Sequence, residues 1–270
     1  MKKLWMMLMV VILTGALVAC TQPAAEEESS LNVGVAFFPM KEILELIHDD
    51  LKADGVELTV SEFSDYQTPN NLLVSKELDA NMIQHDYFLQ SFNEANDSDL
   101  VTILPIYHAT FALYSKDYTA LDEIPEGSVI TLPDDATNLS RALYLLAQAD
   151  LISLTEGKTV GLTLEDIVSN PKNLVLNDLV PLTSLAQRYE ETGMAVMYPT
   201  YAKSLELEGD EQRLYTEVQD DVTKDYAISL VSRQDNKDSA AIQSLIKHLK
   251  SDKVKQFLID EYGWASTPAN

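Results

Sequence analysis

The sequence predicts an α/β protein made of two lobes, and three observations support this. Short apolar runs of strand length alternate with segments in which apolar residues recur every three or four positions. This alternation starts a second time near residue 128. The chain has 270 residues, of which 46% are hydrophobic and 23% are charged, so it can bury one large core or two smaller ones.

The chain begins with a stretch typical of a signal peptide. Residues 1–19 carry two lysines beside the initial methionine and then an uncharged apolar run, too short to span a membrane comfortably. Cys20 is the only cysteine, and Leu17-Val18-Ala19 before it resembles the bacterial lipobox, whose cysteine becomes the lipidated first residue of the mature protein. A buried free cysteine would leave these neighbours unexplained. The sequence therefore predicts a lipid anchor at Cys20.

Residues 20–30 are predicted to form a lipidated flexible tether, because they are rich in proline, alanine, serine and glutamate and lack apolar periodicity. The formal charge of −24 repels phosphate backbones and anionic lipid headgroups. We therefore expect no nucleic-acid partner. Lipid alone should hold the protein on the extracytoplasmic side of the cell membrane.

Lobe 1 is expected to comprise residues 31–107 and about 227–270. Its strands are predicted at residues 31–38, 57–63, 79–83 and 226–232, and its helices after Pro39, after Pro69 and at 86–95, 238–250 and 252–261. The helix after Pro39 has an apolar stripe formed by Met40, Ile43, Leu44, Ile47 and Leu51. Strands that alternate with helices predict parallel pairing.

Lobe 2 is expected to comprise about residues 108–226, with hinge segments near 108–115 and 205–226. The apolar run 101–115 predicts two strands with a bend, because Pro105 interrupts it. Further strands are predicted at 129–132, 174–176 and 194–198. One helix is predicted from an apolar stripe formed by Leu139, Ala142, Leu143 and Leu146, and another is predicted after Pro181.

Four motifs occur in order along the chain: DYQTPN (65–70), DANMIQH (79–85), NLSRAL (138–143) and NPKNL (170–174). With them the sequence resembles the methionine-binding lipoprotein family, the NlpA-type substrate-binding proteins of ABC importers, over nearly its whole length. The resemblance implies a two-lobed periplasmic-binding-protein-like (type 2) fold, each lobe a mixed sheet flanked by helices. It also implies capture of methionine, another small amino acid or a short peptide between the lobes, and delivery to an ABC permease. We expect a monomer.

The resemblance also implies a set of ligand-binding residues. Arg141, at the start of a helix, can hold a carboxylate with its planar guanidinium, and Asn138 can cap that helix or bind the ligand. His85 follows a strand and so lies where parallel strands deliver side chains to a cleft, although a structural histidine is the alternative. Tyr66 and Phe88 match aromatic positions of the family and could instead belong to the core.

The chain departs from the family pattern at several of these positions. Tyr198 and Thr200 stand where the family usually has amides, and Ile228 replaces another. Met82 and Ile83 stand where aromatic residues are usual. We expect the ligand carboxylate to be retained and the amino group or side chain to be recognised differently, so that free methionine binds weakly.

The sequence favours a binding protein over an enzyme. It contains no GxSxG, HExxH, P-loop or GxGxxG motif, so we expect no catalytic residue, metal or cofactor. A secreted lipoprotein hydrolase with paired carboxylates stays open as an alternative, because 43 acidic residues make such pairs common by chance. A surface adhesin or chaperone that binds no small molecule is a third possibility.

Overall fold

The computed structural model describes residues 29–207 and 212–270. The predicted signal peptide, Cys20 and most of the predicted tether lie outside these residues. Ser29 and Ser30, which were predicted to belong to the tether, are the first residues of strand β1 (Ser29–Val35). They belong to the strand because β1 pairs with the next strand from its first residue and the Ser29 N–H donates to the Gly55 carbonyl oxygen over 3.0 Å. None of the described helices is long and apolar enough to cross a membrane.

The first half of the molecule is built on a six-stranded mixed sheet with the order β13-β4-β12-β3-β1-β2. Its further strands are β2 (Val56–Glu62), β3 (Ala80–Gln84), β4 (Val101–Ala109), β12 (Ile228–Ser232) and β13 (Ser266–Pro268). Strand β1 pairs in parallel with β2 and β3, as predicted, whereas β12 runs antiparallel to both of its neighbours.

Helices cover both faces of this sheet. Side chains of α1 (Met40–Leu46), α2 (His48–Ala53), α8 (Ala240–Leu249) and α9 (Asp252–Tyr262) share one apolar cluster with Leu230 of β12, and those of α3 (Thr68–Val74) and α4 (Asp86–Asn96) share another with Val231. Successive strand residues point to opposite faces, so the two clusters lie on the two faces. All five stripe residues of the helix predicted after Pro39 are buried, although the helix is interrupted at Ile47.

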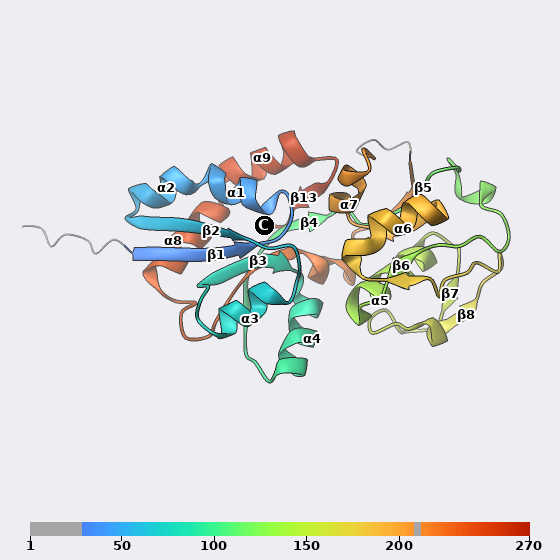
Figure 1. Ribbon diagram of the computed structural model, residues 1–270, viewed down its shortest axis with the longest axis horizontal. Coiled ribbons are helices and arrows are strands. Elements are labelled where there is room, and N and C mark those ends of the chain that lie inside the picture. Colours follow the sequence, from blue (N-terminus) through green and yellow to red (C-terminus); the bar gives the residue numbers. More distant parts are fainter. Residues whose placement is uncertain (1–28, 208–211) are drawn as a thin grey trace, which may run out of the picture.

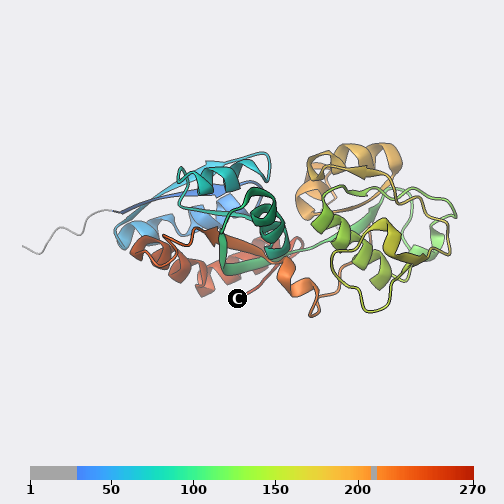
Figure 2. The ribbon, with the colours of Figure 1, turned by 90° about the horizontal axis from the view of Figure 1, so that it is seen from below.

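The second half has a smaller antiparallel sheet of three strands, β10 (Met194–Met197), β5 (Ala112–Ser115) and β11 (Arg213–Thr216). Two short strand pairs accompany it: β6 (Leu132–Pro133) with β9 (Leu179–Val180), and β7 (Ser153–Leu154) with β8 (Ile167–Ser169). The helices are α5 (Ala136–Gln148), α6 (Leu185–Thr192) and α7 (Pro199–Ser204), with 3-10 turns η1 (Leu121–Glu123), η2 (Leu164–Asp166) and η3 (Leu182–Ser184). Figures 1 and 2 show the two halves side by side.

The chain passes between the halves twice, between β4 and β5 and again between β11 and β12, where it forms the 3-10 turn η4 (Thr223–Tyr226). The first passage corrects the sequence prediction, because β4 continues through Pro105 and the break falls at Thr110 and Phe111. Pro105 lies opposite Ser229, beside a register shift between β4 and β12. A proline without an N–H is tolerated at such an irregularity.

Two predicted strands of the second half are reduced to isolated bridges. Residues 129–132 and 174–176 pair with each other only at Val129 and Val175, Thr131 bridges Ala195 of β10, and the first run then continues into β6. The runs are only three or four residues long, and Asn173 before the second has a positive φ of 50°. Ile130 and Leu132 of the first run and Leu174 and Leu176 of the second are buried, whereas Val175 is exposed. The apolar side chains thus enter the core although the backbones pair at isolated positions.

Candidate functional site

A cavity lies between the two halves and has about 530 Å³ of empty space when its open mouth is included. The cavity is narrow, because the centre of a water molecule fits in only about 40 Å³ of it. A ligand larger than a few waters therefore needs the halves to move apart or side chains to turn. The wall includes, from the first half, Phe37, Phe38, Tyr66, His85, Phe88 and Tyr107, and from the second half Asn138, Leu182, Tyr198, Pro199 and Thr200. Six of the seven residues proposed from the sequence are among them; Arg141 is not.

Aromatic side chains form much of this wall. The Phe37 and Tyr66 ring centroids lie 4.7 Å apart, and those of Tyr66 and Phe88 lie 5.9 Å apart. The hydroxyl oxygens of Tyr66 and Tyr201 are 2.9 Å apart, which joins the two halves across the cleft. Such a wall suits an apolar side chain, and its hydroxyl groups can orient a polar end.

His85 is neutral and its tautomer follows from its partners. It caps the N-terminus of α4, where its Nδ1 accepts the Phe88 N–H over 3.2 Å. Nε2 therefore carries the proton and donates to Asn138 Oδ1 at 3.3 Å. Burial, and to a lesser extent the nearby charge of Arg141, lowers the pKa of His85 to about 3.

Asn138 is hydrogen-bonded to side chains of both halves. Its side-chain NH₂ donates to both oxygens of Asp135 over 3.1 Å, and its Oδ1 accepts the Tyr198 O–H over 2.6 Å as well as the His85 proton. Asp135, not Asn138, caps helix α5, because α5 begins at Ala136 and the Asp135 carboxylate accepts the Asn138 N–H. The capping role considered for Asn138 is therefore wrong, and Arg141 lies in the second turn of α5.

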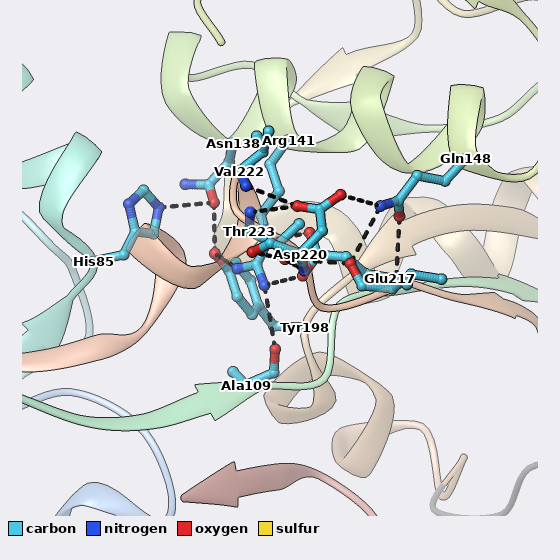
Figure 3. Close-up of polar contacts among 11 residues, drawn as sticks. His85, Ala109, Asn138, Arg141, Gln148, Tyr198, Glu217, Asp220, Val222 and Thr223 are labelled. Carbon is cyan, nitrogen blue, oxygen red and sulfur yellow. Dashed lines mark hydrogen bonds and ion pairs between the residues drawn. The ribbon is translucent and has the colours of Figure 1, made fainter. Parts of the chain in front are cut away.

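Arg141 is fully buried, and its guanidinium faces an acidic side chain (Figure 3). Nε donates to Glu217 Oε1 over 2.7 Å and Nη2 to Glu217 Oε2 over 2.6 Å, whereas Nη1 donates to the Tyr198 hydroxyl over 2.9 Å. The guanidinium also packs against the rings of Phe111 and Tyr226, each 4.7 Å away. Burial alone would lower the pKa of Arg141, but Glu217 raises it above its ordinary value.

The bidentate face of the guanidinium, which we expected to hold a ligand carboxylate, thus holds Glu217. Arg141 contacts two residues of the cavity wall, donating from Nη1 to the Tyr198 hydroxyl and from Nη2 to the Ala109 carbonyl oxygen over 3.4 Å. Tyr198 is connected to His85 through Asn138. Among the described residues, no aspartate, glutamate, lysine or arginine lines the cavity. No described group of three or more histidine, cysteine, aspartate or glutamate side chains could hold a metal ion.

Sequence reasoning missed Glu217, Tyr201 and the Phe37-Phe38 pair. The phenylalanine pair had a usable signal, because it ends the first predicted strand (31–38) and ligand sites gather at the carboxyl ends of strands. Glu217 had none, since it is one of 43 acidic residues in a stretch without apolar periodicity.

Two α/β halves with a cavity between them form the periplasmic-binding-protein-like (type 2) fold of solute-binding proteins. Residues 31–270 match the NlpA lipoprotein family, and the chain belongs to that family. It is 33% identical to the methionine-binding lipoprotein MetQ of Bacillus subtilis over the full length of both chains.

Several solved structures are similar to this one. The substrate-binding protein of a methionine transporter from Streptococcus pneumoniae is 30% identical, with a TM-score of 0.81 over 88% of this chain and 95% of that one. A nutrient-binding protein from Burkholderia cenocepacia, solved bound to methionine, is 28% identical, with a TM-score of 0.82 over 89% of this chain and all of that one.

Proposed function

We propose that this protein is the substrate-binding lipoprotein of an ABC importer, which captures a small amino-acid-like ligand between its halves and presents it to a membrane permease. The observation that carries the proposal is the cavity itself, since both halves contribute to its aromatic and polar wall. Relatives named as methionine-binding lipoproteins and as part of a methionine transporter support it.

We further propose that Tyr66, His85, Phe88, Tyr198 and Thr200, together with Asn138, contact the ligand. Arg141 is then a positioning residue, which holds the Tyr198 hydroxyl and through it the Asn138 side chain. The ligand is methionine, another small amino acid or a short peptide. Because Tyr198, Thr200 and Ile228 replace amides of the family, free L-methionine should bind more weakly than it binds typical relatives.

Ligand entry requires the cleft to open. We propose that residues 31–107 with about 227–270 move as one lobe against about 108–226, by hinge motion near 108–115 and 205–226. The Tyr66–Tyr201 contact and the His85–Asn138 contact both bridge the cleft and would separate on opening. A ligand that touches both lobes favours the closed state by its differential affinity.

The anchor belongs to the same proposal. Relatives in this family are named lipoproteins, and lipidation at Cys20 would hold a monomer on the extracytoplasmic side of the membrane, beside its permease. Neither catalysis nor a cofactor is required for this role.

Two measurements test the function. Mass spectrometry of small molecules released by denaturing the purified protein should identify an amino-acid-like compound, and thermal melting against amino acids and short peptides should show stabilisation of about 2.7 kcal/mol at a hundredfold excess over Kd. Turnover of a peptide or ester would favour the hydrolase alternative. If neither release nor stabilisation occurred with any compound, the adhesin or chaperone alternative would be favoured instead.

A further inference from the structure

We propose that three buried amide side chains, those of Asn70, Asn81 and Gln84, are positioning residues for the wall of the cleft. This amide triad holds the segment before helix α3 against the end of strand β3, the two places from which Tyr66 and His85 reach the cavity. The inference rests on the proposed function and concerns residues that act on a ligand through others.

The amide triad is buried and bonded to itself. Asn70 Nδ2 donates to Gln84 Oε1 over 2.7 Å, and Gln84 Nε2 donates back to Asn70 Oδ1 over 2.6 Å. Asn81 Nδ2 donates to Asn70 Oδ1 over 2.8 Å, and Asn81 Oδ1 accepts from Gln84 Nε2 over 3.2 Å. Every side-chain nitrogen and oxygen of the triad thus has a partner, although at most 2% of each residue is exposed.

The triad joins the segments that carry the aromatic wall. Asn70 lies in the first turn of α3, four residues after Tyr66, and Gln84 is the last residue of β3, directly before His85. His85 in turn accepts the Phe88 N–H at its Nδ1. The bonds of the triad therefore set the separation of the Tyr66 and Phe88 rings, whose centroids lie 5.9 Å apart.

An apolar core would fill the same space without fixing its geometry. Apolar contacts are non-directional, whereas turning any one of these amides over would set nitrogen against nitrogen and oxygen against oxygen. A fully satisfied buried network makes its surroundings rigid and specifies one arrangement. The amides come from the motifs DYQTPN (65–70) and DANMIQH (79–85), so both motifs contribute to the site from behind its wall as well as on its surface.

The direct test replaces the triad by apolar side chains of similar shape, Asn70→Leu with Asn81→Leu and Gln84→Met. Replacing all partners together leaves none of their side-chain polar atoms unpaired, so the urea midpoint should stay close to that of the parent. In both proteins Phe88 is replaced by para-fluorophenylalanine, and fluorine NMR is recorded without ligand. The parent should give one resonance and the triple variant several, or one much broader, because the ring loses its single position. Identical spectra from two folded proteins would overturn the inference.

A second variant leaves the shape of the site unchanged. When protonated, the carboxyl group of Asn70→Asp can make every bond of the parent amide, since its O–H donates to Gln84 and its other oxygen accepts from Asn81 and Gln84. When ionised it cannot donate, and burial raises its pKa. In calorimetry with L-methionine the variant should bind within about threefold of the parent at pH 5 and at least about tenfold more weakly at pH 8. His85 stays neutral throughout, because its pKa is about 3.

The matched control is Asn71→Asp, which places the same carboxylate on the next, exposed residue of α3. It should bind L-methionine like the parent at both pH values. A folded Asn70→Asp variant that also bound like the parent at both values would show that the triad only stabilises the fold, and the inference would fall. If that variant unfolded at pH 8, the triple variant would replace it, with the same tenfold loss expected. A parent that bound no amino acid or short peptide would refute the proposed function instead, and the fluorine spectra would then decide the inference alone.

Discussion

Removing Arg141 should destabilise the fold strongly, and the structure supplies the magnitude. Arg141→Ala leaves the Glu217 carboxylate buried without its partner, and breaking a buried pair from one side costs about 3–5 kcal/mol. The Tyr198 hydroxyl also loses the donor at 2.9 Å, which adds about 1 kcal/mol. A total of about 4–6 kcal/mol is a large fraction of the 5–15 kcal/mol typical of a folded protein.

Urea denaturation followed by far-ultraviolet circular dichroism measures this change. The midpoint should fall while the slope m stays near that of the parent, since the surface exposed on unfolding is unchanged. The control is the double variant Arg141→Met with Glu217→Met, which replaces the pair by apolar side chains of similar length. It should differ from the parent by much less, because an apolar replacement of a buried ion pair is often neutral or stabilising.

Two outcomes would refute the reasoning. A loss below about 1 kcal/mol in Arg141→Ala would mean that Glu217 is solvated or protonated without its partner. A double variant as unstable as the single one would show that the side chains matter for their shape and not for their charge.

Three further predictions concern other parts of the molecule. Cys20→Ser should abolish incorporation of labelled palmitate and release the protein from membranes; a variant labelled like the parent would disprove the anchor. Burial lowers the pKa of His85 to about 3, so the unfolded chain binds a proton below pH 6.5 that the folded protein does not. The His85 contribution to the free energy of unfolding should therefore be fully present above pH 6.5. In urea melts between pH 6.5 and 5 the free energy of unfolding should fall by up to about 1.4 kcal/mol per pH unit. His85→Gln should reduce this slope, whereas His108→Gln should remove only the smaller part due to His108, whose pKa burial also lowers; an unchanged slope in His85→Gln would contradict the assignment. Tyr66→Phe removes the hydroxyl contact to Tyr201 and should enlarge the ligand-free radius in X-ray scattering, with compaction restored by ligand; identical profiles for variant and parent would argue against this contact as part of closure.

The parts of the fold that local patterns specify could be predicted from the sequence. Helices after Pro39 and Pro69, the stripe of α5 and the parallel pairing of β1 with β2 and β3 all follow from periodicity and helix-start signals. The strand break expected at Pro105 could not be placed, because the register shift that accommodates the proline is set by β12, far along the chain.

The candidate site divides in the same way. His85 stands between strand β3 and helix α4, and Asn138 lies in the first turn of helix α5. Both positions follow predicted strands, where sequence context alone suggests a cleft. The partner of Arg141 could not be found, because Glu217 lies 76 residues away and no local pattern distinguishes it from the other acidic residues. Charge pairing between distant segments depends on the folded packing. The motif around a buried arginine therefore does not predict which carboxylate it pairs with.

The central claim is that the cleft between the halves binds a small molecule, and a blocking substitution tests it most directly. Thr200→Trp places a large ring in the half-buried wall of the cleft, whereas Thr183→Trp places the same ring at an exposed position of the same half. Calorimetry should use whichever compound of a panel of free amino acids and short peptides, L-methionine included, binds the parent most tightly. We predict that Thr200→Trp loses at least about tenfold in affinity and that Thr183→Trp binds like the parent. Undiminished binding by a folded Thr200→Trp variant would show that the ligand site lies elsewhere and would contradict the account.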